Sequence, residues 1–226
     1  MHIPDGFIDL PTSVAGYALS TTVIGVALKQ SRRSLNEATA PMAGLAAVFV
    51  FAAQMINFPV AAGTSGHLIG GALAAMLIGP WAAILAMTVV VGAQALIFAD
   101  GGLTALGLNL LNMAIVPVLF GWFGFRLLQR LLPKSRVVAL AAMAVVAYLT
   151  VPLAASMFSL EYAIGGTEVI SSGLVFSSML GVHLLIGIGE AAITTLVVAA
   201  VAKGRPDLVK ALASTKTELI IKEDVR

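Results

Sequence analysis

The opening stretch of the chain, "MHIPDGF", places a histidine directly after the first residue. The terminal amine of Met1, which we expect to be free, can close a five-membered ring on a metal ion together with the backbone nitrogen of His2. The same backbone nitrogen and the nearer ring nitrogen of His2 can close a six-membered ring, so two residues supply three nitrogens in one plane. Such a set favours Ni²⁺ or Cu²⁺ over Zn²⁺ or Mg²⁺ and leaves one corner for a fourth ligand.

The fourth ligand that we expect is His67, in the stretch "GTSGHLIGG". We predict that it lies at the start of a helix, where the positive end of the helix dipole disfavours imidazolium and keeps the ring ready to bind metal. Taken singly, each histidine has a simpler explanation: an accidental residue at position two, and a cap or packing residue at position 67. Together they are stronger candidates, because the chain has 3 histidines and these two fall at the outer ends of segments that can meet.

The third histidine, His183, lies in "HLLIGIGEAAITT", with Glu190 further along the same helical face. Ionisable residues inside a membrane are functional candidates, so this pair supports an alternative hypothesis, a membrane enzyme whose N-terminus is merely structural. We favour a structural role for the pair, since two helical turns separate the residues. A third hypothesis is a structural or sensory membrane protein that transports nothing.

Amide side chains form a further group of candidates, namely Asn109, Asn112, Gln54 and Gln94. Each of them either hydrogen-bonds between helices or orients the metal-binding histidines from a second layer. The first role is favoured for each residue considered by itself.

The elements that must position these residues are transmembrane helices. The chain of 226 residues is 59% hydrophobic and 11% charged, with a mean hydropathy of +1.01, whereas soluble domains contain about 25% charged residues. This composition predicts an all-α, polytopic membrane protein with one membrane domain. The chain has no cysteine, which excludes disulfides and thiolate metal ligands.

A helix needs about 20 apolar residues to cross a bilayer. Seven transmembrane helices are predicted, over residues 11–29, 41–58, 66–79, 80–99, 103–130, 136–159 and 173–203. The third and fourth are divided at Gly79-Pro80, because proline interrupts a helix. The third is too short to span, so the loop before it is expected to dip into the membrane region, where irregular backbone must be buried in protein or line a cavity.

The basic residues predict the orientation of the chain. Cytoplasmic loops carry the excess of lysine and arginine, and the seven predicted helices place all 13 basic residues on one side. The N-terminus is therefore expected outside and the C-terminus in the cytoplasm. Residues 1–203 form the predicted seven-helix transmembrane metal-binding domain, and residues 204–226 a polar cytoplasmic tail.

Four stretches carry a resemblance to a known family: "MHIPDGF", "GTSGHLIGG", "QALIFADGGLTALGLNLLNMA" and "HLLIGIGEAAITT". With them the chain resembles the substrate-binding membrane subunit, or S component, of nickel/cobalt energy-coupling factor (ECF) transporters. The resemblance implies a six-helix S-component core with an extra N-terminal helix. It also implies that nitrogens of Met1, His2 and His67 bind the metal, with His2 giving both its backbone and its ring nitrogen.

The resemblance further implies partners for the chain. The subunit would capture the ion outside the inner membrane of a prokaryote, and a transmembrane coupling subunit with two cytoplasmic ABC ATPases would drive uptake, often with small accessory membrane subunits. A small-residue face around Ala43 and Ala47 resembles the coupling contact of other S components. We expect no nucleic-acid partner, and no cofactor besides the transported ion.

Two missing motifs bear on the class of protein. The sequence contains neither the G-x-x-x-x-G-K-[ST] phosphate loop nor H-E-x-x-H. Together with the resemblance, which implies a transport subunit, these absences predict a chain without its own ATPase and with no catalytic residues. The planar four-nitrogen geometry favours Ni²⁺ as the transported ion, and Co²⁺ uptake for cobalamin biosynthesis, through the same ligands, is the alternative.

Overall fold

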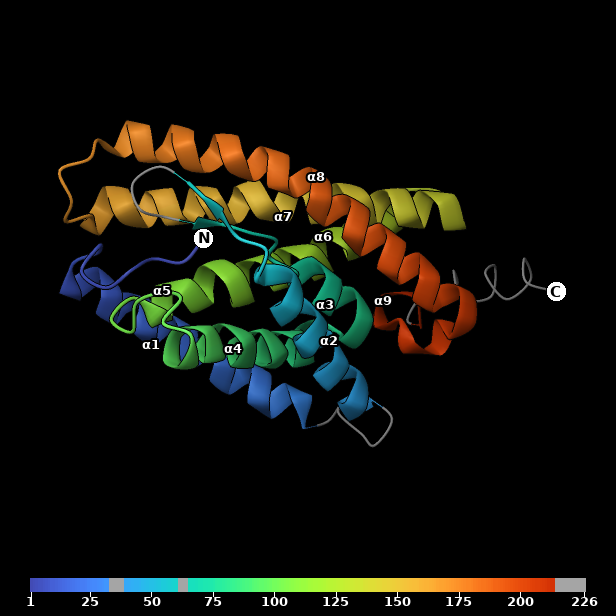
Figure 1. Ribbon diagram of the computed structural model, residues 1–226. Coiled ribbons are helices and arrows are strands. Elements are labelled where there is room, and N and C mark those ends of the chain that lie inside the picture. Colours follow the sequence, from blue (N-terminus) through green and yellow to red (C-terminus); the bar gives the residue numbers. More distant parts are fainter. Residues whose placement is uncertain (33–38, 61–64, 214–226) are drawn as a thin grey trace.

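The computed structural model describes residues 1–32, 39–60 and 65–213, and these residues form an almost entirely helical bundle (Figure 1). The helices are α1 (Leu10–Ser31), α2 (Thr39–Gln54), α3 (Gly71–Ile78), α4 (Pro80–Ile97), α5 (Leu106–Leu110), α6 (Val116–Leu131), α7 (Arg136–Gly165), α8 (Ser172–Gly204) and α9 (Lys210–Ala213). A π-helical stretch, Leu111–Ile115, joins α5 to α6, and a 3-10 turn, Pro206–Leu208, precedes α9. Strands β1 (Phe58–Pro59) and β2 (Ser65–Gly66) pair antiparallel.

Five helical stretches in the described part of the chain are long and apolar enough to cross a membrane. They are α1, α4, the continuous stretch from α5 to α6, α7 and α8. Side chains such as Val89, Leu185 and Leu196 are about 70% exposed on these helices, as expected where lipid replaces water. The all-helical prediction is therefore confirmed for a multi-pass membrane protein, while the number of spans and the orientation of the termini stay predictions.

Several predicted helix ends differ from the structure. The helix predicted from residue 66 begins only at Gly71, because Gly70 has a left-handed backbone with a φ of 76° that interrupts a helix. The helix predicted to end at residue 159 continues to Gly165, through Pro152, so Glu161 lies within α7 and is buried there. The expectation that His67 starts a helix was therefore wrong, since it precedes α3 by several residues.

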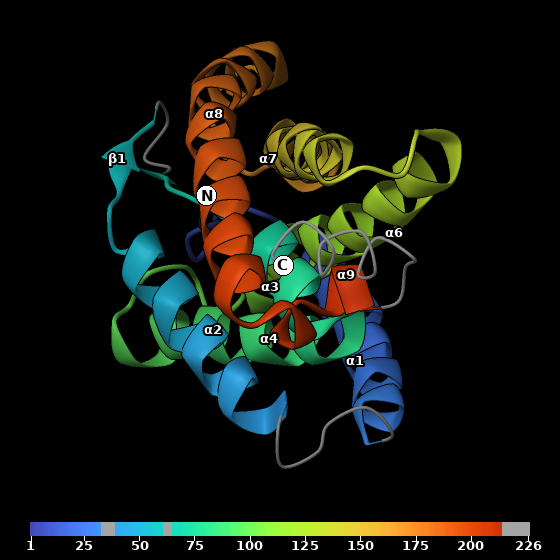
Figure 2. The same cartoon turned by 90° about the vertical axis from the view of Figure 1, so that its right-hand side faces the viewer.

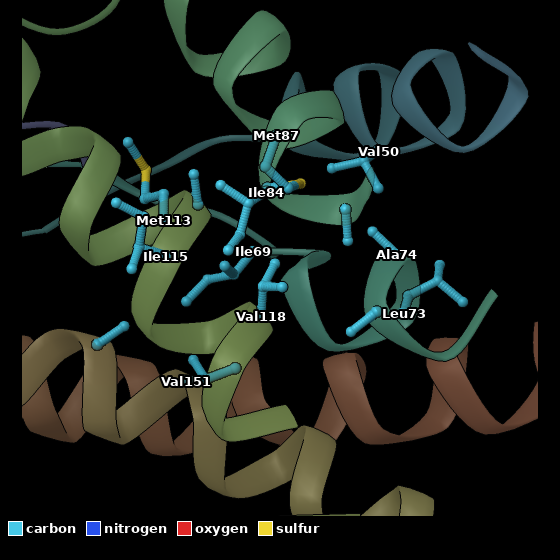
Figure 3. Packing of buried hydrophobic residues seen from close by; sticks show 14 of the residues in the cluster. Val50, Ile69, Leu73, Ala74, Ile84, Met87, Met113, Ile115, Val118 and Val151 are labelled. Atoms are coloured by element: carbon cyan, nitrogen blue, oxygen red, sulfur yellow. The ribbon is translucent and has the colours of Figure 1, made fainter. Parts of the chain in front are cut away.

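The short helix α3 forms the centre of the fold. All eight of its residues are buried, and Figure 2 shows it enclosed by its neighbours in the bundle, among them α2, α4 and α6. Figure 3 shows Leu73 and Ala74 of this helix beside Val50 of α2, Ile84 of α4 and Val118 of α6. Its Gly71 packs against Pro117, where a Cβ would lie only 3.0 Å from the proline ring.

The segment after α8 covers the far end of α3. Val209, Ala211 and Leu212 are buried, and Lys210 lies beside Gly79 at the end of α3. The predicted tail after residue 203 thus begins as a packed segment, and its residues 214–226 lie outside the described part of the chain.

Candidate metal centre

The first three residues of the chain are buried inside the bundle, and Asn109 of α5 holds them there. Met1, His2 and Ile3 are at most 4% exposed. The N–H of Ile3 donates to Oδ1 of Asn109 over 2.8 Å, and Nδ2 of Asn109 donates to the carbonyl of Ile3 over 3.1 Å. The N–H of Gly102 donates to the same carbonyl over 2.8 Å. The backbone of Ile3 is therefore fixed on both of its polar groups, directly after His2.

Residues further along the N-terminal segment fasten it to the connections at the same end of the bundle. The carboxylate of Asp5 accepts hydrogen bonds from the N–H and the hydroxyl of Thr104, each 2.7 Å long. The ring of Phe7 packs on Tyr162 with ring centres 5.0 Å apart, and Thr167 donates its N–H to the carbonyl of Phe7. These contacts bind the segment to the connections α4–α5 and α7–α8.

Two glycines in the α4–α5 connection allow this close approach. A Cβ on Gly102 would lie 2.3 Å from the backbone nitrogen of Asp5. Gly101 has a φ of 97°, which disfavours any other residue, and a Cβ there would lie 2.8 Å from Nδ1 of His2. Neither glycine was among the predicted site residues, although two adjacent glycines after an aspartate are a recognisable turn signal.

His67 lies in a segment without regular secondary structure between β2 and α3, and Glu190 of α8 is its main support. The carboxylate of Glu190 accepts hydrogen bonds from the N–H of Ile69 over 2.9 Å and from the N–H of Gly70 over 2.7 Å. On the other side, Nε2 of Gln54 donates to the carbonyl of Ile69 over 2.6 Å, and Gln94 in turn donates to Gln54 over 2.8 Å. Helices α2, α4 and α8 therefore jointly position this segment.

The ring of His67 has one nitrogen available for a metal. Its Nδ1 lies 2.7 Å from the carbonyl of Leu68, and since a carbonyl only accepts, Nδ1 carries the proton. Its Nε2 is buried and has no hydrogen-bond partner among the described residues. The lone pair of this nitrogen is therefore unused by the protein.

The structure brings His2 and His67 together. Their ring centres lie 5.0 Å apart, with the ring planes tilted by 36°. Two imidazoles at adjacent corners of a planar site, with metal–nitrogen bonds of about 2.0 Å, would have ring centres roughly 4.5 Å apart. The observed spacing is close to that value, so one ion between the rings requires little movement.

Burial keeps the donor nitrogens neutral. It lowers the pKa of the Met1 amine to about 4, with Asp100 opposing the shift, and burial followed by the nearby amine lowers the pKa of His2 to about 3. Burial likewise holds the pKa of His67 well below its usual value. Neutral amines and imidazoles are the forms that bind metals, so these groups need lose no proton near pH 7.

Among the described residues, side chains alone do not complete a metal site. Within residues 1–32, 39–60 and 65–213, no cluster of three or more His, Cys, Asp or Glu side chains is arranged to hold a metal ion. An ion between His2 and His67 would therefore need main-chain donors, which the Met1 amine and the His2 backbone nitrogen can supply.

The other candidates occupy different positions. Both carboxylate oxygens of Glu190 bond to backbone N–H groups, and Nδ1 of His183 lies 2.7 Å from the carbonyl of Met179 in its own helix, so the proposed His183–Glu190 pair does not form a hydrogen bond. Asn112 donates to Glu161 of α7 over 2.6 Å, in contrast to Asn109. Asn109 lies in α5 and Asn112 lies within the π-helical stretch Leu111–Ile115, and the two side chains have different neighbours. The sequence carried no signal for this stretch.

Buried polar groups held by several helices, together with long apolar spans, define a multi-pass membrane protein with a polar centre, and similarity to known proteins identifies its family. A family model described as "Cobalt uptake substrate-specific transmembrane region" matches residues 2–208. The chain belongs to this family of membrane transport components for metal ions.

Individual relatives agree with this assignment. A "Putative metal transport protein" of Haloquadratum walsbyi is 39% identical over 209 residues, which cover 92% of this chain and 93% of the relative. A "Putative fused nickel transport protein" of Archaeoglobus fulgidus is 39% identical over 214 residues, covering 95% of this chain and 70% of the relative. A crystal structure of a truncated transition metal transporter superposes with a TM-score of 0.83 at 31% identity, covering 90% of this chain and 99% of that one. Relatives are thus named for metal transport, and the protein is a transporter component rather than an enzyme.

Proposed function

We propose that this protein captures a divalent transition-metal ion, Ni²⁺ in preference to Co²⁺, on the outer face of a prokaryotic inner membrane and delivers it for ATP-driven uptake. The ligands are the Met1 amine, the backbone and ring nitrogens of His2, and Nε2 of His67. The family and the names of its members support a metal cargo. The choice of nickel rests on the planar nitrogen geometry, which suits Ni²⁺ best.

The observation that carries the proposal is the pairing of two buried imidazoles beside a buried terminal amine. The rings of His2 and His67 lie 5.0 Å apart, and the ring nitrogens other than the proton-bearing Nδ1 of His67 make no hydrogen bond in the described part of the chain. Buried polar groups normally have hydrogen-bond partners, so these unpaired ring nitrogens lower the stability of the fold unless a ligand binds them. A bound metal ion satisfies it.

The test is the metal content of the purified protein with Met1 unblocked, after exposure to equal Ni²⁺ and Co²⁺. Wild type, His2→Ala and His67→Ala are compared, and visible absorption is recorded. We expect about one Ni²⁺ per wild-type chain, a planar-nickel absorption band, and loss of both in each variant. Equal metal binding by all three proteins would refute the proposed site.

Cobalt remains the second candidate for the cargo, because the description of the matching family model names cobalt uptake. The same ligands would serve Co²⁺, and the competition experiment separates the two ions. Preferential retention of Co²⁺ would keep the site and reassign the cargo to cobalt, as in uptake for cobalamin biosynthesis.

The proposed partners are a transmembrane coupling subunit, cytoplasmic ABC ATPases and small accessory membrane subunits of an ECF complex. The chain carries no phosphate-loop motif of its own, so accumulation against a gradient requires such partners. The proposed orientation, with the N-terminus outside, places the candidate metal centre at the outer face. The basic residues near Lys29, Arg136 and Lys203 would then lie at the cytoplasmic face.

A further inference from the structure

Asp100 is the acidic residue in contact with the ring of His2. Its Oδ2 lies 3.5 Å from Nε2 of His2, and its side chain is 27% exposed whereas that of His2 is 3% exposed. The backbone at this position is unusual, since the preceding Ala99 has a left-handed φ of 53°, which costs energy for a residue with a Cβ. The connection after α4 thus aims a carboxylate from the surface at a buried imidazole.

This contact favours one tautomer of His2. A neutral imidazole carries its proton on one nitrogen only, and an acceptor close to one nitrogen favours the proton on that nitrogen. Oδ2 of Asp100 is such an acceptor: its contact with Nε2 is an ion-pair contact at 3.5 Å rather than a hydrogen bond, and it favours the form with the proton on Nε2. The lone pair then lies on Nδ1, which is the nitrogen that can close the six-membered chelate ring.

Charge provides a second reason for a carboxylate here. Binding of a divalent ion with loss of the His2 backbone proton leaves the site with a net charge of about +1, and buried charges are stable only when paired. Glu190 is less suited to this role, because both of its oxygens already accept backbone hydrogen bonds. Asp100 faces His2 directly and has no such commitment to backbone N–H groups in the described part of the chain.

We propose that Asp100 is a positioning residue for metal binding, which fixes the proton of His2 on Nε2, directs Nδ1 to the metal, and balances the charge of the bound ion. The inference rests on the function proposed above. Carboxylates that orient metal-binding histidines commonly contribute 10–100-fold to affinity, and an effect of that size is expected here.

The test uses the full chain with Met1 unblocked, titrated with Ni²⁺, as wild type, Asp100→Ala, Asp100→Asn and Glu168→Gln. Glu168→Gln is the matched control, because Glu168 is also acidic and lies in the α7–α8 connection, which contacts the N-terminal segment through Thr167, but its own side chain is exposed. We expect Asp100→Ala to weaken Ni²⁺ binding by about 10–100-fold while the planar-nickel band at saturation persists. Glu168→Gln should stay within about twofold of wild type, as expected for an exposed charge.

A second readout separates orientation from charge. Nitrogen NMR of the metal-free protein, with the His2 signal assigned by its loss in His2→Ala, should report the proton on Nε2 in wild type. Asp100→Ala should shift the proton toward Nδ1. Asp100→Asn should keep it on Nε2, because the amide oxygen still accepts, yet should weaken Ni²⁺ binding because the charge is gone.

The outcomes distinguish the two proposals. If His2→Ala binds Ni²⁺ as wild type does, the proposed function fails and this inference fails with it. If His2→Ala abolishes binding while both Asp100 variants bind like wild type with the same His2 tautomer, only this inference is overturned. If Asp100→Ala does not fold, Asp100→Asn decides through its affinity relative to Glu168→Gln.

Discussion

The two segments that bring the histidines together are held in different ways. Asn109, a neutral amide, holds the segment of His2 by accepting a hydrogen bond from Ile3 and donating one to it. Glu190, an acid, holds the segment of His67 by accepting hydrogen bonds from two consecutive N–H groups, and Gln54 donates to the same segment from the opposite side. The comparison shows that the candidate metal centre is assembled from separate helices, so its geometry depends on how α5 and α8 lie relative to each other.

The segments also differ in the chemistry they offer. The N-terminal segment offers an amine, a backbone nitrogen and a ring nitrogen, of which the backbone nitrogen must lose a proton to bind metal. The segment of His67 offers one neutral imidazole and loses none. The following predictions use these differences.

The largest effect should come from altering the N-terminus itself. Adding one residue before His2, or acetylating Met1, removes the terminal amine from its place in the chelate. Because this changes a ligand rather than its support, Ni²⁺ affinity should fall by more than the about 100-fold typical of supporting residues. Isothermal titration with the modified and native proteins measures the change, and unchanged transport after a one-residue insertion would exclude the chelate geometry.

Acid should weaken metal binding with a slope set by the N-terminal segment. The amine of Met1 and the ring of His2 have pKa values of about 4 and 3, so neither takes up a proton between pH 8 and pH 5. Only the His2 backbone proton then competes with the metal, and affinity should fall about tenfold per pH unit as pH decreases. Competitive titration across this range gives the slope.

His67→Ala serves as the control for the acid dependence. It should lower affinity at every pH but leave the slope unchanged, because His67 binds as a neutral ring. A flat profile in wild type between pH 8 and pH 5 would contradict binding through the His2 backbone nitrogen.

Replacing Glu190 should lower the stability and the Ni²⁺ affinity more than replacing Asn109. Glu190→Ala leaves the N–H groups of Ile69 and Gly70 buried without their partner, and each such loss costs about 1–3 kcal/mol of unfolding free energy. We expect a lower thermal midpoint and about a tenfold to 100-fold loss of Ni²⁺ affinity. Thermal unfolding in detergent and metal titration measure the two effects, and a Glu190→Ala protein that matches wild type in both would show that Glu190 does not hold the segment.

Asn109→Ala should have the smallest of these effects, because the carbonyl of Ile3 keeps its hydrogen bond from Gly102. Only the N–H of Ile3 loses its hydrogen-bond partner, so a loss of about 1–3 kcal/mol in stability and roughly tenfold in affinity is expected.

The Asn109→Ala, Glu190→Ala double variant tests whether the two residues act independently, since losses at independent sites add. Strong non-additivity in the free energy of unfolding would show that the hydrogen bonds of Asn109 and Glu190 belong to one coupled network.

The sequence allowed the type of fold and the candidate ligands to be predicted because both depend on local signals. Long apolar runs predict helices that span a membrane, and "MHIPDGF" places a chelating pair in adjacent positions. The supports of the site could not be predicted in the same way. Asn109 and Glu190 lie 106 and 120 or more positions from the backbone groups they hold, and pairings of that kind depend on the packed fold.

Two further features could not be predicted from the local sequence. His67 was expected at a helix start, but it lies before α3, in a segment held by hydrogen bonds to Glu190 and followed by Gly70 with its left-handed backbone. Asn109 and Asn112 are three positions apart, yet Asn112 lies in the π-helical stretch Leu111–Ile115 and contacts Glu161, whereas Asn109 contacts Ile3. Neither carries a strong propensity signal, since tertiary contacts outweigh local preference at both places.

The buried helix α3 is a short, fully enclosed element that links two ends of the bundle. Eight residues make it about 12 Å long, with the His67 segment attached at Gly70 and Lys210 resting against Gly79 at the other end. Close-packed interiors transmit displacement rather than absorb it, and every residue of α3 is enclosed. A shift of the His67 segment would therefore be transmitted along α3 to its other end, where Lys210 of α9 lies against Gly79.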